Sequence, residues 1–294
     1  MKESYLYTKQ GDIIECQTCH HFCHIAPFKR GICGLRENNK GKLLVLNYGR
    51  LIAQEIDQIE KKPFFHFLPK TKTFSIASVG CNFHCAWCQN WDISQCSKEE
   101  SSRDEVMNEL GFETTPEQVV QDAIRFNCPS ISYTYTEPTV FLEFALDTMK
   151  LAHKENLKNI WVSNGYMSDQ TLDLILPYLD AINVDLKLFD QNKLTKYTGA
   201  KLEPILKNLK KIYNNKTHLE ITTLVISDIN DSEEQLKEIA EFIVSISPDI
   251  PWHISRFFPA YKMLGQPITP IETLELAQSI GKKAGLRYTH VGNI

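Results

Sequence analysis

The stretch that decides the fold is Thr73–Val79 followed by Gly80-Cys81-Asn82-Phe83-His84-Cys85-Ala86-Trp87-Cys88. Thr73–Val79 is a short apolar run with β-forming residues, which is typical of a buried strand. Three cysteines, Cys81, Cys85 and Cys88, then lie in one loop directly after it. Because parallel α/β folds carry their chemistry at the carboxyl ends of strands, we expect this loop at the active end of the fold.

The rest of the chain repeats a strand-then-helix pattern. Six further strands are predicted: Ser130–Tyr135, Asn159–Ser163, Ala181–Asp185, His218–Ile226, Pro251–Arg256 and Leu286–Val291. Such repetition predicts a parallel sheet with right-handed crossovers, because parallel neighbours need a long connection. The predicted fold is α/β, a partial (β/α)6-type TIM barrel, and a doubly wound open sheet is the alternative.

Two amphipathic helices are predicted between these strands. Thr115–Phe126 begins with a threonine N-cap and a proline at the first helical position. Ser232–Ile246 begins with a serine cap followed by two glutamates. Caps, first-turn acids and an apolar face at helical spacing are the signals of a helix packed on a core.

Composition excludes several classes of protein. The 294 residues carry a formal net charge of only −4, and lysine and arginine are spread along the chain, so no nucleic-acid binding is predicted. Neither a signal peptide nor an apolar stretch long enough to span a membrane is found, so we expect a cytoplasmic protein without a membrane partner.

Seven of the nine cysteines lie in two tight clusters, which favours metal ligation over disulfides. Cys96 and Cys128 remain, and we interpret them as ordinary thiols.

The first 68 residues differ from the rest, and we predict an N-terminal Cys-rich module at 1–68 and a barrel at 69–294. Cys16, Cys19, Cys23 and Cys33 follow a Cys-x2-Cys-x3-Cys-x9-Cys pattern. Four thiolates within eighteen residues can close a tetrahedral zinc site that stabilises a small module, so zinc is favoured. An auxiliary iron–sulfur cluster, reduced thiols or disulfides are the alternatives. Ser97–Phe112 is polar and acidic, and we expect a loop there.

The spacing of Cys81, Cys85 and Cys88 suits an iron–sulfur cluster. Three thiolates in one loop can hold three irons and leave a fourth iron without a protein ligand. A structural zinc site would need a fourth ligand, for which His84 is the nearest candidate, although its position between the cysteines makes closure awkward. The open iron is the place where a cofactor or substrate can bind.

This spacing, with the aromatic Trp87 before the last cysteine, resembles the radical S-adenosylmethionine superfamily. The resemblance implies a [4Fe–4S] cluster whose open iron chelates the amino and carboxylate groups of S-adenosylmethionine. It implies one electron from an external donor such as flavodoxin or ferredoxin, cleavage of a carbon–sulfur bond, and a 5′-deoxyadenosyl radical. Trp87 would contact the adenine side of the cofactor or, alternatively, pack within the cluster loop. No catalytic residue beyond the cluster and cofactor is expected.

The same resemblance assigns cofactor-binding residues at the next two strand ends. Glu137, after Tyr135 and Thr136, lies where the family has a Gly-Gly-Glu motif that holds the methionyl amine, although both glycines are replaced. The alternative is that Glu137 caps a helix that starts at Pro138. Ser163 and Asn164 close the third strand and are also expected to bind the cofactor.

Asp185 and Lys187 end the fourth strand. Alternation places both on one face, which points an acid and a base together into the barrel mouth. A similar Asp-Leu-Lys contacts the cofactor in glycyl-radical-enzyme activases, and His253 matches a cofactor-contacting histidine there. The alternatives are a structural ion pair and a core histidine. Glu220, on the fifth strand, is expected at the same rim.

Longer phrases narrow the resemblance to the radical enzyme of the AmmeMemoRadiSam system, related to pyruvate formate-lyase activating enzymes. They are Arg30-Gly31-Ile32-Cys33-Gly34-Leu35-Arg36-Glu37-Asn38, Ile59-Glu60-Lys61-Lys62-Pro63, Cys88-Gln89-Asn90-Trp91 and Trp252-His253-Ile254-Ser255-Arg256-Phe257-Phe258-Pro259-Ala260-Tyr261. That family commonly continues into a tail with a further Cys-x-x-Cys pair, whereas this sequence stops at Ile294. A short variant and a truncated sequence are both compatible with this difference.

The predicted function is reductive cleavage of S-adenosylmethionine, with hydrogen abstraction from an unidentified substrate. That substrate is either a small molecule or a protein glycine, as in the activating enzymes. A non-catalytic metal-binding scaffold is the alternative from a different class.

Overall fold

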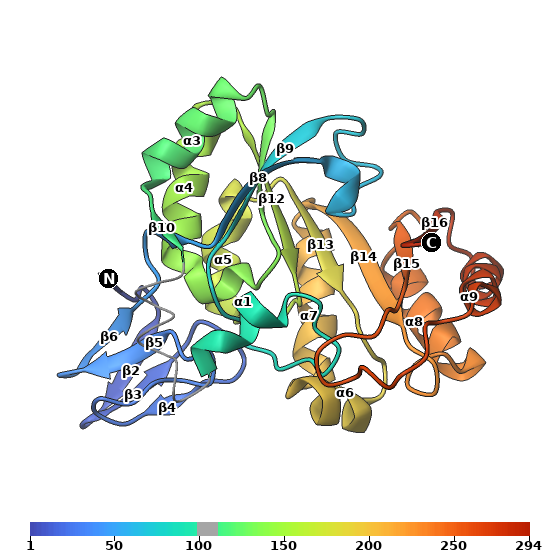
Figure 1. Ribbon diagram of the computed structural model, residues 1–294, viewed down its shortest axis with the longest axis horizontal. Coiled ribbons are helices and arrows are strands. Elements are labelled where there is room, and N and C mark those ends of the chain that lie inside the picture. The colour runs from blue at the N-terminus through green and yellow to red at the C-terminus, as the bar shows by residue number, and fades with distance from the viewer. Residues whose placement is uncertain (99–110) are drawn as a thin grey trace.

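The computed structural model describes residues 1–98 and 111–294, and its main body is one curved sheet covered by helices (Figure 1). The strands are β8 (Ala53–Gln58), β9 (Lys72–Ala77), β11 (Ser130–Tyr133), β12 (Lys158–Ser163), β13 (Ala181–Asp185), β14 (His218–Val225), β15 (Trp252–Arg256) and β16 (Thr289–Gly292). Neighbours follow chain order from β8 to β16. All pairs from β9 to β16 are parallel, and β8 is antiparallel to β9. Because the order never reverses, the partial barrel is confirmed over the doubly wound sheet.

Each of the seven predicted strands is present, with shifted ends. The last strand begins only at Thr289, because Gly285 ends the preceding helix in a left-handed conformation and Leu286 N–H still donates to Gly281. Tyr135 lies beyond the end of β11, in the loop that follows. The strand cores were therefore predictable, and their ends depend on the neighbouring caps.

Helices cover the outer face of the sheet. They are α3 (Pro116–Arg125), α4 (Leu142–Lys154), α5 (Asp169–Ile175), α6 (Gln191–Thr198), α7 (Leu202–Asn214), α8 (Glu233–Ile246) and α9 (Ile271–Ala284). Short 3-10 turns precede or extend several elements: η1 (Ile59–Lys61), η3 (Pro138–Phe141) and η4 (Leu176–Tyr178). Both predicted helices are confirmed. Thr115 and Gln118 form a capping box on α3, and Ser232 caps α8.

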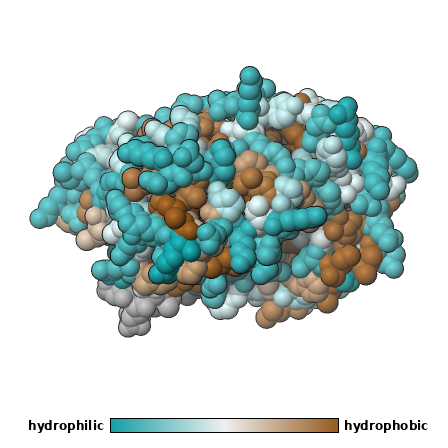
Figure 2. Space-filling model, turned by 90° about the horizontal axis from the view of Figure 1, so that it is seen from above, coloured by the Kyte–Doolittle hydropathy of each residue, from teal (hydrophilic) through white to brown (hydrophobic). Residues whose placement is uncertain are grey.

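The apolar core lies between the sheet and these helices. Fully buried strand residues such as Ile131, Trp161 and Ile254 face helix residues such as Val119 and Leu236 within one cluster. The outer surface is mainly hydrophilic with separate apolar patches (Figure 2). In the described part of the chain, no helix combines the length and apolar character needed to cross a membrane.

The N-terminal segment builds small antiparallel sheets beside the barrel (Figure 1). Its strands are β1 (Lys2–Glu3), β2 (Tyr7–Gln10), β3 (Ile13–Cys16), β4 (His24–Ile25), β5 (Arg36–Asn39), β6 (Lys42–Val45) and β7 (Arg50–Leu51). They enclose a small apolar cluster of Ile14, Cys16, Ile25 and Leu43. The division at residue 68 stays a prediction, and strand β8, which precedes that position, belongs to the main sheet.

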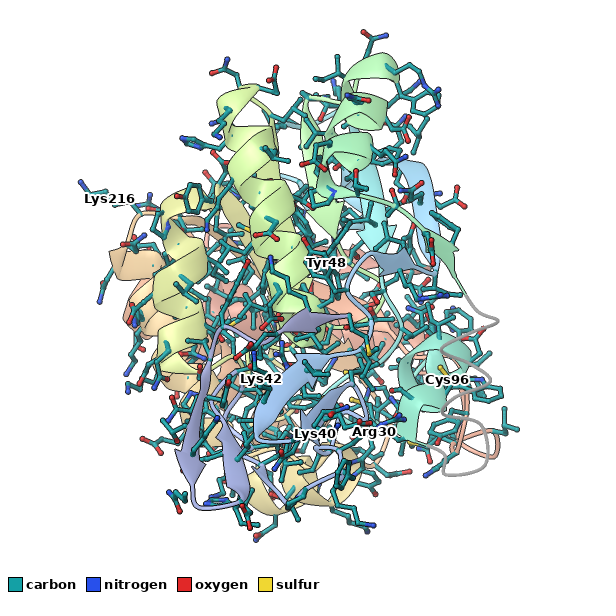
Figure 3. The ribbon with its side chains drawn as sticks, turned by 90° about the vertical axis from the view of Figure 1, so that its left-hand side faces the viewer. Arg30, Lys40, Lys42, Tyr48, Cys96 and Lys216 are labelled. Atoms are coloured by element: carbon teal, nitrogen blue, oxygen red, sulfur yellow. The ribbon has the colours of Figure 1, made fainter. Side chains whose placement is uncertain are left out.

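Buried polar contacts fasten this segment to helix α4. Arg36 and Glu143 form a two-pronged ion pair with N–O distances of 2.9 and 2.8 Å, and both side chains are buried. Tyr48 lies beside α4, and its hydroxyl donates to Asp147 at 2.7 Å (Figure 3). Charge-assisted pairs of this geometry are strong and directional, so the segment has a defined position on the barrel.

The loop predicted at Ser97–Phe112 falls mostly outside the described residues. Helix α1 (Trp91–Gln95) follows the cysteine loop, and Ser97 belongs to the 3-10 turn η2 (Cys96–Lys98). Phe112 begins strand β10 (Phe112–Glu113), which pairs with β7.

Candidate active site

A cavity of about 330 Å³ opens at the carboxyl ends of the parallel strands. It is lined by most of the predicted site residues: Cys81, Cys85, Cys88, Trp87, Glu137, Ser163, Asn164, Asp185 and Lys187. They come from the last residues of β12 and β13 and from the loops after β9, β11, β12 and β13. The rule that strand ends converge at one edge of the sheet therefore placed them together correctly.

The cysteine loop is held tightly in place. Gly80 has a φ of 95°, and a Cβ there would lie 2.4 Å from Leu35, so only glycine fits this turn. On the other side, His84 N–H donates to Thr198 and Ala86 N–H to Tyr197, both at 3.1 Å. His84, the fourth ligand that a zinc site would need, does not line the cavity with the three cysteines.

The three thiols suit a metal cluster. Burial raises the pKa of the Cys85 thiol to about 11 and raises that of Cys81 further. Bare thiolates are therefore disfavoured at this position, whereas coordination to a metal cation stabilises them. Three cysteines that line one open cavity fit a [4Fe–4S] cluster that keeps one iron free of protein ligands.

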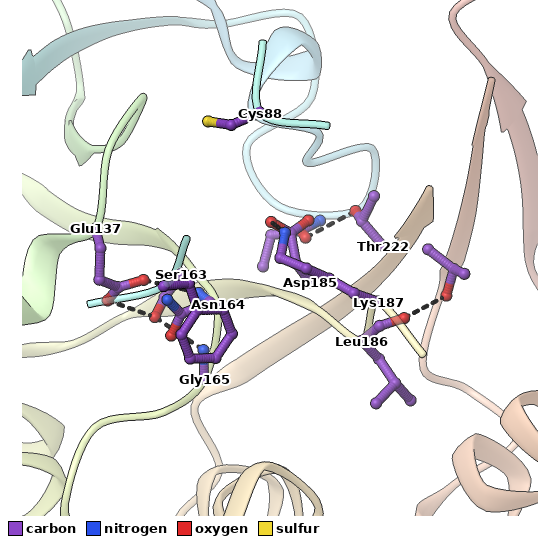
Figure 4. Close-up of polar contacts among 12 residues, drawn as sticks. Cys88, Glu137, Ser163, Asn164, Gly165, Asp185, Leu186, Lys187 and Thr222 are labelled. Carbon is purple, nitrogen blue, oxygen red and sulfur yellow. Dashed lines mark hydrogen bonds and ion pairs between the residues drawn. The ribbon is translucent and has the colours of Figure 1, made fainter. Parts of the chain in front are cut away.

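Glu137 is a buried carboxylate surrounded by neutral donors (Figure 4). It accepts hydrogen bonds from Thr139 N–H and hydroxyl, from the Ser163 hydroxyl at 2.9 Å and from Asn164 N–H at 2.8 Å. It caps the 3-10 turn η3, as the structural alternative proposed. Burial raises its pKa, and among the described ion pairs none includes Glu137. A cationic amine in the cavity would supply the missing charge.

Asn164 ties this carboxylate to the cysteine loop. Its side-chain N–H group donates to Asn82 Oδ1 at 2.7 Å and lies 3.9 Å from Cys81 Sγ. Its backbone N–H donates to Glu137. One residue thus sets the distance between this carboxylate and the cysteine loop.

Asp185 and Lys187 form an ion pair of 2.7 Å at the cavity wall, while Leu186 is buried on the opposite face (Figure 4). Burial works against a charged Lys187, but Asp185 and the nearby Cys85 raise its pKa above the usual range. Lys187 is therefore a cation in the wall of the cavity that the three cysteines also line. The pair lines the cavity and is also an ion pair within the protein. The geometry is therefore compatible with cofactor contact and with a structural role.

Trp87 is buried and lines the cavity. Its ring lies 5.8 Å from that of Tyr197. Trp87 therefore packs against helix α6 and also lines the cavity.

His253 is not brought to the cavity. Its Nε2 lies 2.5 Å from Glu220 Oε2, while His218 contacts the other oxygen of Glu220 at 2.9 Å. The backbone N–H groups of Phe65 and His66 also donate to Glu220, so the loop before β9 covers this end of the barrel. The expectation that Glu220 lies at the rim was wrong, because both residues lie toward the amino ends of their strands.

The sequence model of the Radical SAM superfamily matches residues 75–243, more than half of the chain. The chain belongs to the radical SAM superfamily. It is accordingly a radical SAM enzyme, from a family that uses a [4Fe–4S] cluster and S-adenosylmethionine. The narrower AmmeMemoRadiSam assignment stays a prediction.

Relatives of this radical SAM enzyme include an uncharacterized protein of Methanocaldococcus jannaschii, 41% identical over 100% of this chain and 86% of that protein. A pyruvate formate-lyase-activating enzyme of Staphylococcus epidermidis is 26% identical over 74% of this chain and 88% of its own. Among solved structures, a radical SAM methyltransferase from Sphaerobacter thermophilus is 14% identical and has a TM-score of 0.57, covering 77% of this chain and 67% of that one. The last likeness concerns the fold alone.

Sequence reasoning missed a polar group at the far side of the radical SAM cavity. Lys61, Lys62 and Tyr135 also line it. Lys62 forms a buried ion pair of 2.7 Å with Asp57 and lies 4.0 Å from the centre of the Tyr135 ring. The sequence Ile59-Glu60-Lys61-Lys62-Pro63 contains two of these residues, but it indicated only a family resemblance and not the contacts of Lys62 with Asp57 and Tyr135.

Proposed function

We propose that this enzyme reductively cleaves S-adenosylmethionine to a 5′-deoxyadenosyl radical, which abstracts a hydrogen atom from a substrate not yet identified. When bound, the cluster and an electron from an external donor such as a flavodoxin or ferredoxin supply the chemistry that breaks the carbon–sulfur bond and releases methionine. The observation that carries the proposal is the placement of Cys81, Cys85 and Cys88 in one cavity with the uncompensated Glu137.

In this proposal, each lining residue has a defined task. Glu137 binds the methionyl amine, and Ser163 and Asn164 hold that carboxylate in place through hydrogen bonds of 2.9 and 2.8 Å. Lys187, oriented by Asp185, offsets negative charge near the sulfurs and orients the cofactor. Trp87 contacts the adenine side. These residues bind and orient the cofactor and exclude water from the reactive radical.

The test is anaerobic reconstitution with iron and sulfide, reduction with dithionite, and measurement of 5′-deoxyadenosine by chromatography. We expect product from the wild type and from Cys128→Ala, a buried thiol outside the cavity. Cys88→Ala should give none. Wild-type product no higher than that of Cys88→Ala would refute the proposal.

A protein glycine is the second candidate substrate, and the similarity to a pyruvate formate-lyase-activating enzyme favours considering it. Incubation with candidate partner proteins should then produce a glycyl radical signal in the partner by EPR. Hydrogen transfer into 5′-deoxyadenosine from a small molecule, without such a signal, would instead identify small-molecule chemistry.

A non-catalytic scaffold makes a different prediction. Its reduced cluster would have no open iron, so adding S-adenosylmethionine would leave the EPR spectrum unchanged. We expect the spectrum to change, because the cofactor binds at the iron.

A further inference from the structure

The four cysteines of the N-terminal segment surround a second, separate cavity. Cys16, Cys19, Cys23 and Cys33 all line it. Cys16 ends strand β3, Cys23 directly precedes β4, and Cys33 lies in the turn before β5. Four cysteines from these strands and the loops beside them thus line one cavity, and we propose that they bind a single structural zinc ion.

The size of the cavity favours one ion over a cluster. The free space among the lining residues is about 20 Å³, which is room for little more than one water-sized sphere. A cube of four irons and four sulfides would need several times that space. A zinc ion with four thiolates and no open position is the usual closed structural site.

The immediate surroundings supply a donor to one of the sulfurs. Ile32 N–H points at Cys23 Sγ at 3.5 Å. Gly31 lies against the same sulfur, since a Cβ built on it would be in van der Waals contact with Cys23 Sγ at 3.4 Å. Amide donors to coordinating groups orient them and stabilise their charge.

Two of the neighbouring histidines have other polar partners, and His20, whose buried Nε2 has no hydrogen-bond partner among the described residues, lies outside the cavity lining, which leaves the cysteines as ligands. His24 is largely exposed and faces Glu15 at 3.8 Å. His20 does not line the cavity and packs against Phe22. His21 lines it, but its Nε2 is hydrogen-bonded to Asn82 O at 2.9 Å.

Binding requires a small rearrangement of the thiols. Within residues 1–98 and 111–294, no group of three or more His, Cys, Asp or Glu side chains is already close enough together to hold a metal ion. The cysteine side chains therefore turn toward the centre of the cavity when zinc binds. Arg36, buried and paired with Glu143, lines the same cavity and places positive charge beside the four thiolates.

The zinc site would also support the radical site. Asn82, the residue after Cys81, lines the zinc cavity, and its carbonyl accepts the contact from His21. Its side chain accepts from Asn164, which binds Glu137. A short series of hydrogen bonds therefore runs from His21 to the Glu137 carboxylate. We expect zinc to fix the position of the loop that carries Cys81, Cys85 and Cys88.

The test is metal analysis of protein purified anaerobically without chelators, followed by reconstitution. We expect one zinc per chain in the wild type, in Cys88→Ala and in Cys128→Ser. Cys23→Ser should lose the zinc, and Cys23→His, which keeps a zinc ligand, should recover it. Retention of zinc in Cys88→Ala separates this proposal from the radical chemistry, because that variant makes no 5′-deoxyadenosine.

A second measurement covers the case in which Cys23→Ser does not fold. Wild-type protein stripped with a chelator should bind one Co²⁺ and show the visible bands of a tetrahedral cobalt thiolate, which zinc then abolishes. Iron and sulfide lost specifically in Cys23→Ser would overturn zinc in favour of a cluster. No zinc in the wild type and no cobalt bands would overturn the site itself.

Discussion

The Tyr135 hydroxyl donates a hydrogen bond to Asp57 Oδ2 at 2.5 Å, and the two residues are 78 positions apart. Tyr135 has a φ of 64°, a left-handed conformation that is unfavourable for a bulky residue. It occupies the first glycine position of the Gly-Gly-Glu pattern, so the backbone shape expected of glycine is kept. The contacts with Asp57 and Lys62 hold the ring over the cavity despite the backbone cost.

Replacing Asp57 by Asn should destabilise the fold. The Lys62 ammonium is only 3% exposed and would lose its partner at 2.7 Å. We expect the free energy of unfolding in urea to fall by about 2 kcal/mol. The matched control is Glu241→Gln, which removes the exposed pair with Lys237 and should cost less than about 0.5 kcal/mol. Equal effects of the two substitutions would contradict a buried role for Asp57.

Replacing Glu137 by Gln should weaken cofactor binding. The amide keeps the shape of the side chain but removes the negative charge that we propose binds the methionyl amine. The Kd for S-adenosylmethionine should therefore rise about 10- to 100-fold. Calorimetry on the reconstituted protein measures this, and urea unfolding checks that the cap of η3 survives. Glu155→Gln, at an exposed position, is the control, and an unchanged Kd in Glu137→Gln would remove Glu137 from the binding site.

Gly199→Ala should disturb the cysteine loop. Gly199 has a φ of 79°, and a Cβ there would lie 2.3 Å from the ring of His84. Gly11 has a similar φ of 64° with nothing within 4 Å. Gly11→Ala should therefore cost only the backbone term of about 1 kcal/mol, while Gly199→Ala costs more and lowers the iron retained after reconstitution. Equal iron contents and equal stabilities of Gly199→Ala and Gly11→Ala would show that the His84 ring moves aside without cost.

Glu220 should make stability depend on acid pH. Burial alone would raise the pKa of Glu220, but contacts with His218 and His253 lower it to about 2 from the ordinary 4.5. Its folded pKa is below the unfolded one, so its contribution is complete above pH 4.5 and is lost as the pH falls toward 2. Within that window the loss is about 1.4 kcal/mol per pH unit.

Urea unfolding at pH 5.5, 4.5 and 3.5 tests this expectation. Glu220→Gln should lower stability at pH 5.5 and show a shallower decline toward pH 3.5 than the wild type. Parallel declines in the two proteins would assign the acid sensitivity to other carboxylates, such as Asp57.

Local signals explain what could be predicted. Capped helices such as α3 and the strand Ala181–Asp185 are specified by short-range patterns, and strand ends brought Glu137, Asp185 and Lys187 together. Alternation predicts the face on which a side chain lies but not its height along the strand, so His253 was placed at the wrong end. Strand β8 was missed because its sequence, Ala-Gln-Glu-Ile-Asp-Gln, is polar and pairs through the backbone.

The contact of Asp57 and Lys62 with Tyr135 could not be predicted either. It joins a segment before the first parallel strand to the loop after the second, and no periodicity in the sequence connects these positions. Such long-range polar contacts depend on how the finished sheet curves.

The two cysteine sites differ in how much of the chain each one needs. The N-terminal four lie within eighteen residues, whereas the cavity at Cys81 takes its walls from residues as late as Ser255 and Asn293. Sites with low contact order can form early, while the polypeptide is still being synthesised. The four cysteines of the first site can therefore come together before the second cavity has most of its walls, although Asn82, Thr139 and Val140 also line the first cavity. We expect an order of maturation in which the N-terminal loop forms first and the site at Cys81 follows once the barrel has closed around it.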